Sequence, residues 1–121
     1  MTEVWNNSVL VQFPRTVVFN DHFTAGYSFQ DIDLSAVVGS RRAVVILKCA
    51  KDAQVGNHIL FNRRNGDVGS ENGNSNVYSL ASPGSYQGHM VADTDDNGVI
   101  EVSSDENTHV WTITVEAFIY A

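Results

Sequence analysis

The most constraining feature of this sequence is a strict two-residue alternation near its C-terminal end. In residues 111–121, "WTITVEAFIYA", the odd-numbered positions from Trp111 to Ile119 are apolar, and the even-numbered positions from Thr112 to Tyr120 form the opposite face. Period two with β-branched and aromatic residues is typical of a strand. We predict that this strand pairs inside a sheet, because an unpaired apolar edge promotes aggregation.

Shorter segments repeat the strand signal along the chain. Residues 42–50, "RAVVILKCA", form a continuous apolar run, which predicts a strand covered on both faces. Helix signals are confined to residues 31–40, where Ser35 is a weak cap and Gly39 a stop, enough for one turn. The number and spacing of the strands indicate a sandwich or a barrel. The other predicted strands cover residues 8–13, 16–19, 25–29, 57–62, 76–81, 88–94 and 99–104.

Length, charge and cysteine content exclude several classes of protein. A chain of 121 residues predicts a single domain, residues 1–121, which can bury a core without cross-links. The net charge of -7 opposes binding to nucleic-acid phosphates, and the arginine pairs at 41–42 and 63–64 are not interleaved with aromatic residues. We therefore predict no nucleic-acid partner. Cys49, the only cysteine, is predicted to be a buried, inert thiol because it lies in an apolar run.

The hydropathy of the chain predicts no membrane partner. No apolar run approaches the ~20 residues that a membrane-spanning helix needs. Residues 1–15 also lack the apolar core of a signal peptide. We therefore expect a protein that is made in the cytosol.

The segment "VADTDDNGVIEV", residues 91–102, has two interpretations. Its acidic residues and its Asn-Gly pair match the first half of a calcium-binding loop. The twelfth position of that loop needs a bidentate carboxylate, but counting from Asp93 this position is Ser104. Asn-Gly between two alternating segments is instead a strong hairpin signal. We predict a hairpin turn without a metal, and the alternative is a calcium clip of Asp93, Asp95 and Asp96.

The sequence shows no catalytic set and no cofactor motif. Residues 83–88, "PGSYQG", lack the G-x-S-x-G order of a nucleophile elbow, and the chain has no phosphate loop or dinucleotide fingerprint. The four histidines, His22, His58, His89 and His109, lack the spacing of a helical metal site. Zinc or copper binding by a cluster formed on folding is the alternative. We predict a non-enzymatic protein without a cofactor.

Candidate contact residues come from a polar loop and from aromatic residues outside the core pattern. Residues 62–76, "NRRNGDVGSENGNSN", are predicted to form a long loop, and loops on rigid scaffolds are common binding elements. Exposed tyrosines beside Asn-rich loops can build a sugar-binding surface. The alternative is that these aromatic residues lie in the core or in a subunit contact. The candidates are Arg63, Arg64, Asn72, Tyr86, Phe118 and Tyr120.

Three segments resemble parts of the small β-sandwich domains in tailed-phage virion surface proteins. They are "DIDLSAVVGSRRAVVILKC" (31–49), "VADTDDNGVIEV" (91–102) and "WTITVEAFIYA" (111–121), in a resemblance that covers residues 25–121. The resemblance implies an antiparallel, jelly-roll-like sandwich. It also implies fold-forming, non-catalytic roles for Asp33, Leu34, Val38, Gly39, Arg42, Ala43, Asp95, Asn97, Gly98 and Glu101.

The function that this resemblance implies is structural. We expect a non-enzymatic virion protein, made in the host cytoplasm, that decorates or cements the capsid surface. The expected partners are further copies of the chain, in a homotrimer, and other virion proteins such as the major capsid protein. Phe118 and Tyr120 are expected to meet another element or subunit. The alternatives are a tail-fibre or receptor-binding module and a soluble, lectin-like domain whose partners are surface glycans.

Overall fold

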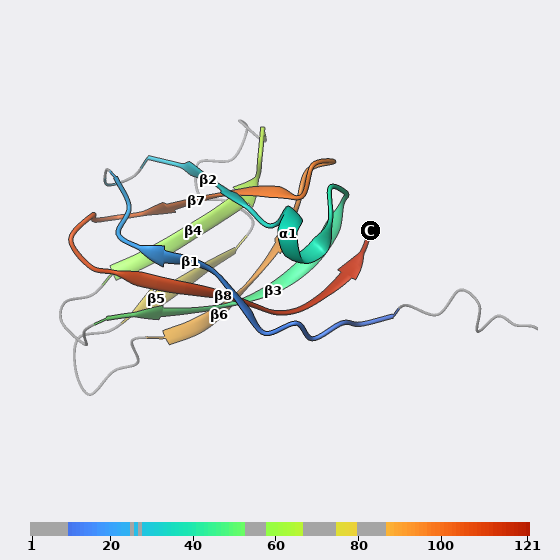
Figure 1. Ribbon diagram of the computed structural model, residues 1–121. Coiled ribbons are helices and arrows are strands. Elements are labelled where there is room, and N and C mark those ends of the chain that lie inside the picture. Colours follow the sequence, from blue (N-terminus) through green and yellow to red (C-terminus); the bar gives the residue numbers. More distant parts are fainter. Residues whose placement is uncertain (1–9, 25, 27, 53–57, 67–74, 80–86) are drawn as a thin grey trace, which may run out of the picture.

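The described part of the chain forms eight strands and one helical turn, arranged as two facing sheets (Figure 1). The computed structural model describes residues 10–24, 26, 28–52, 58–66, 75–79 and 87–121, with the backbone alone for 75–79. The elements are β1 Thr16–Asp21, β2 Gln30–Asp33, α1 Ser35–Val38, β3 Ala43–Lys51, β4 His58–Arg64, β5 Ser75–Ser79, β6 Gln87–Asp93, β7 Val99–Ser104 and β8 Trp111–Tyr120. The first sheet has the order β1-β8-β3-β6, and the second has the order β2-β7-β4-β5.

The strands are connected as a jelly roll. The first four strands pair antiparallel with the last four strands in reverse order: β1 with β8, β2 with β7, β3 with β6, and β4 with β5. These four strand pairs fold over one another, so that β8 also pairs with β3, and β7 also pairs with β4. Double-sheet jelly rolls contain eight strands and two Greek keys. The prediction of an all-β, antiparallel, jelly-roll-like sandwich is therefore confirmed.

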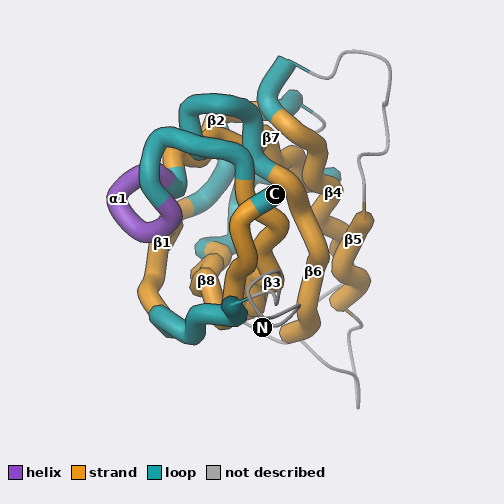
Figure 2. The backbone as a smooth tube through the Cα atoms, turned by 90° about the vertical axis from the view of Figure 1, so that its right-hand side faces the viewer, coloured by secondary structure: helices purple, strands orange, loops and turns teal. Residues whose placement is uncertain are grey.

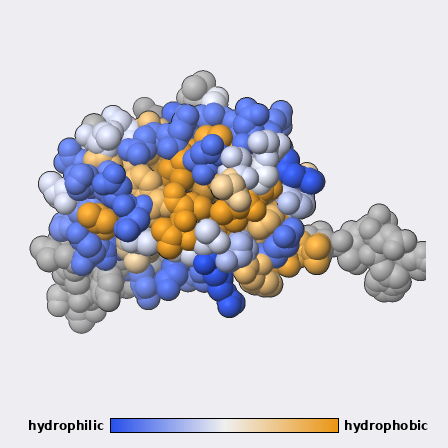
Figure 3. Space-filling model, in the orientation of Figure 1, coloured by the Kyte–Doolittle hydropathy of each residue, from blue (hydrophilic) through white to orange (hydrophobic). Residues whose placement is uncertain are grey.

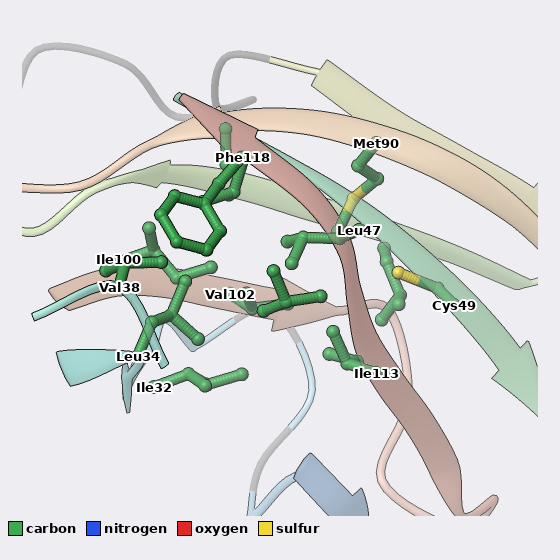
Figure 4. Packing of buried hydrophobic residues seen from close by; sticks show 14 of the residues in the cluster. Ile32, Leu34, Val38, Leu47, Cys49, Met90, Ile100, Val102, Ile113 and Phe118 are labelled. Carbon is green, nitrogen blue, oxygen red and sulfur yellow. The ribbon is translucent and has the colours of Figure 1, made fainter. Parts of the chain in front are cut away.

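The hydrophobic core lies between the two layers that Figure 2 shows from the end of the sandwich near the C terminus. Figure 4 shows side chains of both sheets, among them Leu47 of β3 and Val102 of β7, pointing into this space. The inward residues of β3, including Val45 and Cys49, are fully buried. Burial raises the pKa of the Cys49 thiol to about 12. The predicted burial of this thiol is confirmed, and a thiol held neutral is a poor nucleophile.

The positions predicted for the N-terminal strands are partly wrong. Of the strand predicted at residues 8–13, the described residues contribute one isolated bridge, between Gln12 and Phe118. The strand predicted at residues 25–29 is wrong for the described residues 26, 28 and 29, because β2 begins at Gln30, whereas residues 25 and 27 lie outside the described residues.

The helical turn predicted within residues 31–40 forms, but it begins differently. The residue before the turn is Leu34, whose side chain caps nothing, so the prediction of Ser35 as the cap is wrong. The Ser35 amide instead donates a hydrogen bond to Oδ1 of Asp33 at 2.8 Å. Gly39 ends the turn as predicted, with a φ of 87°.

A β-bulge interrupts the pairing of β8 with β3. Ile46 of β3 lies opposite Ala117, whereas the next residue, Leu47, lies opposite Val115. Glu116 is therefore an extra residue in β8. An extra residue in one strand reverses the faces of all residues that follow it.

The bulge changes the role of the last residues of β8. Phe118 lies opposite Val45, faces the core and is 3% exposed. Ile119 lies opposite Val44 and turns outward. The strict alternation predicted for residues 111–121 is thus wrong beyond the bulge, and Phe118 belongs to the core rather than to an outer face.

The turn after β6 connects the two sheets. Because β6 belongs to the first sheet and β7 to the second, the prediction that residues 91–102 form a hairpin is wrong. A turn does form over residues 94–98, where Oδ1 of Asp95 accepts hydrogen bonds from two backbone amides at 2.9 Å. A two-residue Asn-Gly hairpin needs positive φ at both residues, but here Gly98 alone of that pair has a positive φ, 80°.

Candidate functional site

The outer side of β3 is left open by the rest of the described chain. Whereas the inward residues of β3 are fully buried, the outward residue Ile46 is 42% exposed and Val44 is half-buried. The prediction that residues 42–50 form a strand covered on both faces is therefore wrong for the outer face. In a two-layer sandwich each sheet covers one face of the other. The described residues therefore leave the outer face of β3 partly exposed.

Outward residues on the neighbouring strands extend this apolar surface. Ile46 lies between Ala117 of β8 and Val91 of β6, and Val44 lies opposite Ile119. Residues directly opposite in antiparallel strands share a face, so these side chains are neighbours. Val91 is 52% exposed, more than Ile46.

The segment before β1 borders the same surface. Gln12 exchanges two backbone hydrogen bonds of 2.9 Å with Phe118, which holds this segment beside β8. Val11 lines, together with residues of β3 and β8, a depression of about 220 Å³. Leu10 and Phe13 nearby are 73% and 62% exposed. We call the following six residues the outer apolar patch: Val11, Val44, Ile46, Val91, Ala117 and Ile119.

Polar residues limit the outer apolar patch on the same face of the sheet. The next outward residue of β3, Lys48, lies opposite His89 on β6 and Thr114 on β8. Asp93 borders the patch along β6. An apolar centre with a polar rim is the usual anatomy of a protein–protein contact. The six patch residues carry no group that can act as an acid, a base or a nucleophile, so the chemistry available to the patch is binding.

A second apolar area occupies the middle of the face seen in Figure 1 (Figure 3). The edge strands β1 and β2 of the two sheets lie toward the viewer there. Val18, Phe19 and Val37 are partly buried and pack against the core. These residues are therefore explained by the packing of the sandwich itself.

The two arginines predicted as contact residues are paired within the chain. Nε of Arg63 contacts the carboxylate of Glu101 on β7, and its guanidinium carbon lies 3.9 Å from the centre of the Phe29 ring. Nη1 of Arg64 lies 3.3 Å from Oδ2 of Asp93. Both side chains thus tie β4 to neighbouring elements.

The aromatic residues predicted as contacts differ in their exposure. Phe118 is wrong as an exposed contact residue because it is buried. Tyr120 is 40% exposed, and the guanidinium carbon of Arg41 lies 3.5 Å from the centre of its ring. Asn72 and Tyr86 lie outside the described residues.

Two of the three carboxylates of the alternative calcium clip have structural partners. Oδ2 of Asp93 lies 3.1 Å from Nη2 of Arg42. Burial alone would raise the pKa of the Asp95 carboxyl, but hydrogen bonds from Asn65 and from two backbone amides lower it below its ordinary value. Asp96 is exposed. The absence of a calcium site here stays a prediction.

Folding brings together two of the four histidines. Among the described residues, one set has the composition and spacing of metal ligands: His58, Glu106 and His109. The sequence did not predict this set, because its members come from β4 and from the segment between β7 and β8. No helix of the described chain is long and apolar enough to cross a membrane.

Comparison of the chain with protein-family models, with curated proteins and with solved structures finds no match.

Ile46 and Val91 are exposed residues that were not predicted as contacts. The sequence does contain a signal for an exposed apolar surface on this strand. Residues 43–47 are apolar on both alternating faces, whereas a two-layer sandwich covers one face of a strand. A second apolar face therefore marks a candidate contact surface.

Proposed function

We propose that this chain is a non-enzymatic assembly protein that binds further copies of itself through the outer apolar patch, and that the assembly decorates the surface of a phage particle. The observation that carries the proposal is the exposure of Ile46 and Val91 on a strand pair whose inner faces are fully packed. Apolar side chains gathered on a sheet face are typical of a contact surface.

The patch favours self-association of modest strength. Stable interfaces bury about 1,600 Å² in total, and the six patch residues supply a part of that area. Leu10 and Phe13, next to the patch, extend the apolar surface that a second copy can cover. In a closed symmetric oligomer each copy contributes the same patch, so several weak contacts act together.

The virion setting rests on the resemblance of three segments to phage surface domains. Those segments form β2-α1-β3, the β6–β7 connection and β8. Jelly rolls occur in viral capsid proteins and in lectins, so the fold is compatible with both classes without choosing between them.

Quantitative mass spectrometry of density-purified phage particles tests this setting. We expect the chain in the particles at a copy number comparable to that of the shell protein. Absence of the chain from purified particles contradicts the virion proposal. Binding to a glycan array combined with that absence favours the lectin-like alternative.

A further inference from the structure

The start of β4 and the connection from β7 to β8 lie at the end of the sandwich opposite the C terminus (Figure 1). Three side chains of these segments, His58, Glu106 and His109, lie close together. His58 begins β4, whereas Glu106 and His109 lie in the connection from β7 to β8. One potential ligand atom from each residue lies within 4.8 Å of the others, and all three residues are half-buried. The two imidazole rings lie 5.1 Å apart between their centres, at an angle of 49°.

Each imidazole is oriented by a carboxylate of its own. Nδ1 of His58 lies 3.4 Å from Oδ2 of Asp105, and Nδ1 of His109 lies 3.2 Å from Oδ1 of Asp52. A carboxylate on one ring nitrogen fixes the proton there and leaves the lone pair of Nε2 for a metal. Both rings therefore have the outer-sphere support that metal-binding histidines usually have.

The carboxylates are themselves held by the backbone. Oδ1 of Asp105 accepts a hydrogen bond from the Ile59 amide at 3.2 Å. The carboxylate of Glu106 accepts hydrogen bonds from the amides of Thr108 at 2.7 Å and of His109 at 3.2 Å. These contacts reduce the conformational freedom that the ligands would lose on binding an ion.

The local charge favours a cation. The buried side chain of Lys51 interacts with three carboxylates, those of Asp52, Asp105 and Glu106. The three carboxylates and the ammonium group together carry a formal net charge of -2. A divalent ion would balance this charge.

We propose that His58, Glu106 and His109 bind a divalent first-row transition metal, with Zn²⁺ as the best fit. Two imidazole nitrogens and one carboxylate oxygen are a ligand set that Zn²⁺ accepts in tetrahedral geometry with one further position. Ca²⁺ and Mg²⁺ prefer oxygen ligands throughout. Tetrahedral Zn²⁺ places its donors roughly 3.3 Å apart, so the three side chains draw together on binding.

The ion stabilises the sandwich by joining the two sheets. β4 and β7 belong to the second sheet, and β3 and β8 belong to the first. Asp52 directly follows β3, and His109 lies just before β8. An ion bound between these segments would hold the two sheets together at that end of the core. Because the unfolded chain holds no such site, binding adds directly to stability.

Titration of the full, untagged chain with Zn²⁺ tests this site. After treatment with a chelator and its removal, isothermal calorimetry is expected to show one Zn²⁺ per chain with micromolar or tighter affinity. Excess Zn²⁺ should raise Tm by about 5 °C or more, whereas Ca²⁺ should leave it unchanged. Binding of Co²⁺ should give the intense visible absorption of a tetrahedral site. Failure of the wild-type chain to bind Zn²⁺ at this stoichiometry overturns the proposal.

Variants assign the binding to these residues. His109→Ala and Glu106→Gln should each weaken Zn²⁺ binding at least about tenfold, with circular dichroism confirming that both remain folded. His22→Ala and His89→Ala remove exposed histidines outside the cluster and should bind as the wild type does. If His58→Ala and His109→Ala both bind Zn²⁺ with wild-type affinity, the ion is held elsewhere and the proposal is wrong.

Discussion

At the scale of single residues, Gly98 joins two segments that are distant in sequence. Its carbonyl oxygen accepts a hydrogen bond of 2.9 Å from the Leu34 amide at the start of α1. A Cβ atom at Gly98 would lie 2.4 Å from the carbonyl oxygen of Gly39. The segments 31–49 and 91–102 thus pack against each other at a residue without a side chain.

Replacement of Gly98 by alanine should therefore destabilise the fold strongly. Gly98→Ala is expected to lower the free energy of unfolding by about 3 kcal/mol, because the new Cβ meets backbone and φ is positive. Gly66→Ala is the matched control, since Gly66 also has a positive φ, 87°, with nothing within 4 Å of its Cβ position. It should cost about 1 kcal/mol. Equal losses for both variants in urea unfolding would contradict the predicted contact.

Asp95 links the turn before β7 to the acid stability of the chain. Its pKa in the folded state lies below the ordinary value of 3.8 because hydrogen bonds outweigh burial. A carboxyl with a lowered folded pKa stabilises above its unfolded pKa, and this contribution is lost as pH falls through the folded pKa.

Asp95→Ala should lower the free energy of unfolding at pH 7 by about 1 kcal/mol, because two backbone amides lose their acceptor. It should also flatten the loss of stability below about pH 4. Asp96→Ala, at an exposed residue of the same turn, should stay within about 0.5 kcal/mol of wild type. Urea unfolding at a series of pH values measures both. An unchanged acid dependence in Asp95→Ala would count against this role.

At the scale of elements, the bulge at Glu116 decides which face of β8 each later residue occupies. It places Phe118 in the core and Ile119 in the outer apolar patch. The period of the sequence cannot reveal this, because an added residue changes the pairing partner and leaves the local propensities unchanged.

The bulge predicts losses of stability of different size at two neighbouring residues. Phe118→Ala should lower the free energy of unfolding by about 3–4 kcal/mol through a cavity in the core. Ile119→Thr, on the outer face, should cost about 1 kcal/mol or less. Thermal and urea unfolding of the two variants measure the difference. A larger loss for Ile119→Thr would mean that β8 alternates without a bulge.

Local sequence predicts where a turn lies, but it does not predict which strands the turn connects. A turn was predicted between the strands at residues 88–94 and 99–104 and does form. It connects two sheets, however, because β6 pairs with β3 and β7 pairs with β4. Those pairings are set by which faces pack into the core, and this information is spread over the whole chain.

At the scale of the whole molecule, the all-β sandwich was predictable from two segments. The apolar run at residues 42–50 and the alternation at residues 111–115 mark the two central strands of the first sheet, β3 and β8. The candidate sites were less predictable. Ile46 and Val91 become neighbours through the register of β3 with β6. His58 and His109 meet because two connections end at the same side of the sandwich, which no spacing in the sequence encodes.

The molar mass of the full chain in solution tests the assembly proposal most directly. A paired variant, Ile46→Thr with Val91→Thr, makes the patch polar while keeping β-branched residues. Its matched control is Lys48→Thr with His89→Thr, the next outward pair on the same two strands. Circular dichroism and melting curves should show that both variants remain folded.

Sedimentation equilibrium, at concentrations up to about 300 µM to include weak association, compares the three proteins. The wild type and the control should approach about 40 kDa, the mass of a trimer, whereas the patch variant should remain at 13.3 kDa. A wild-type mass of 13.3 kDa throughout this range, or association of the patch variant equal to that of the wild type, would contradict the account.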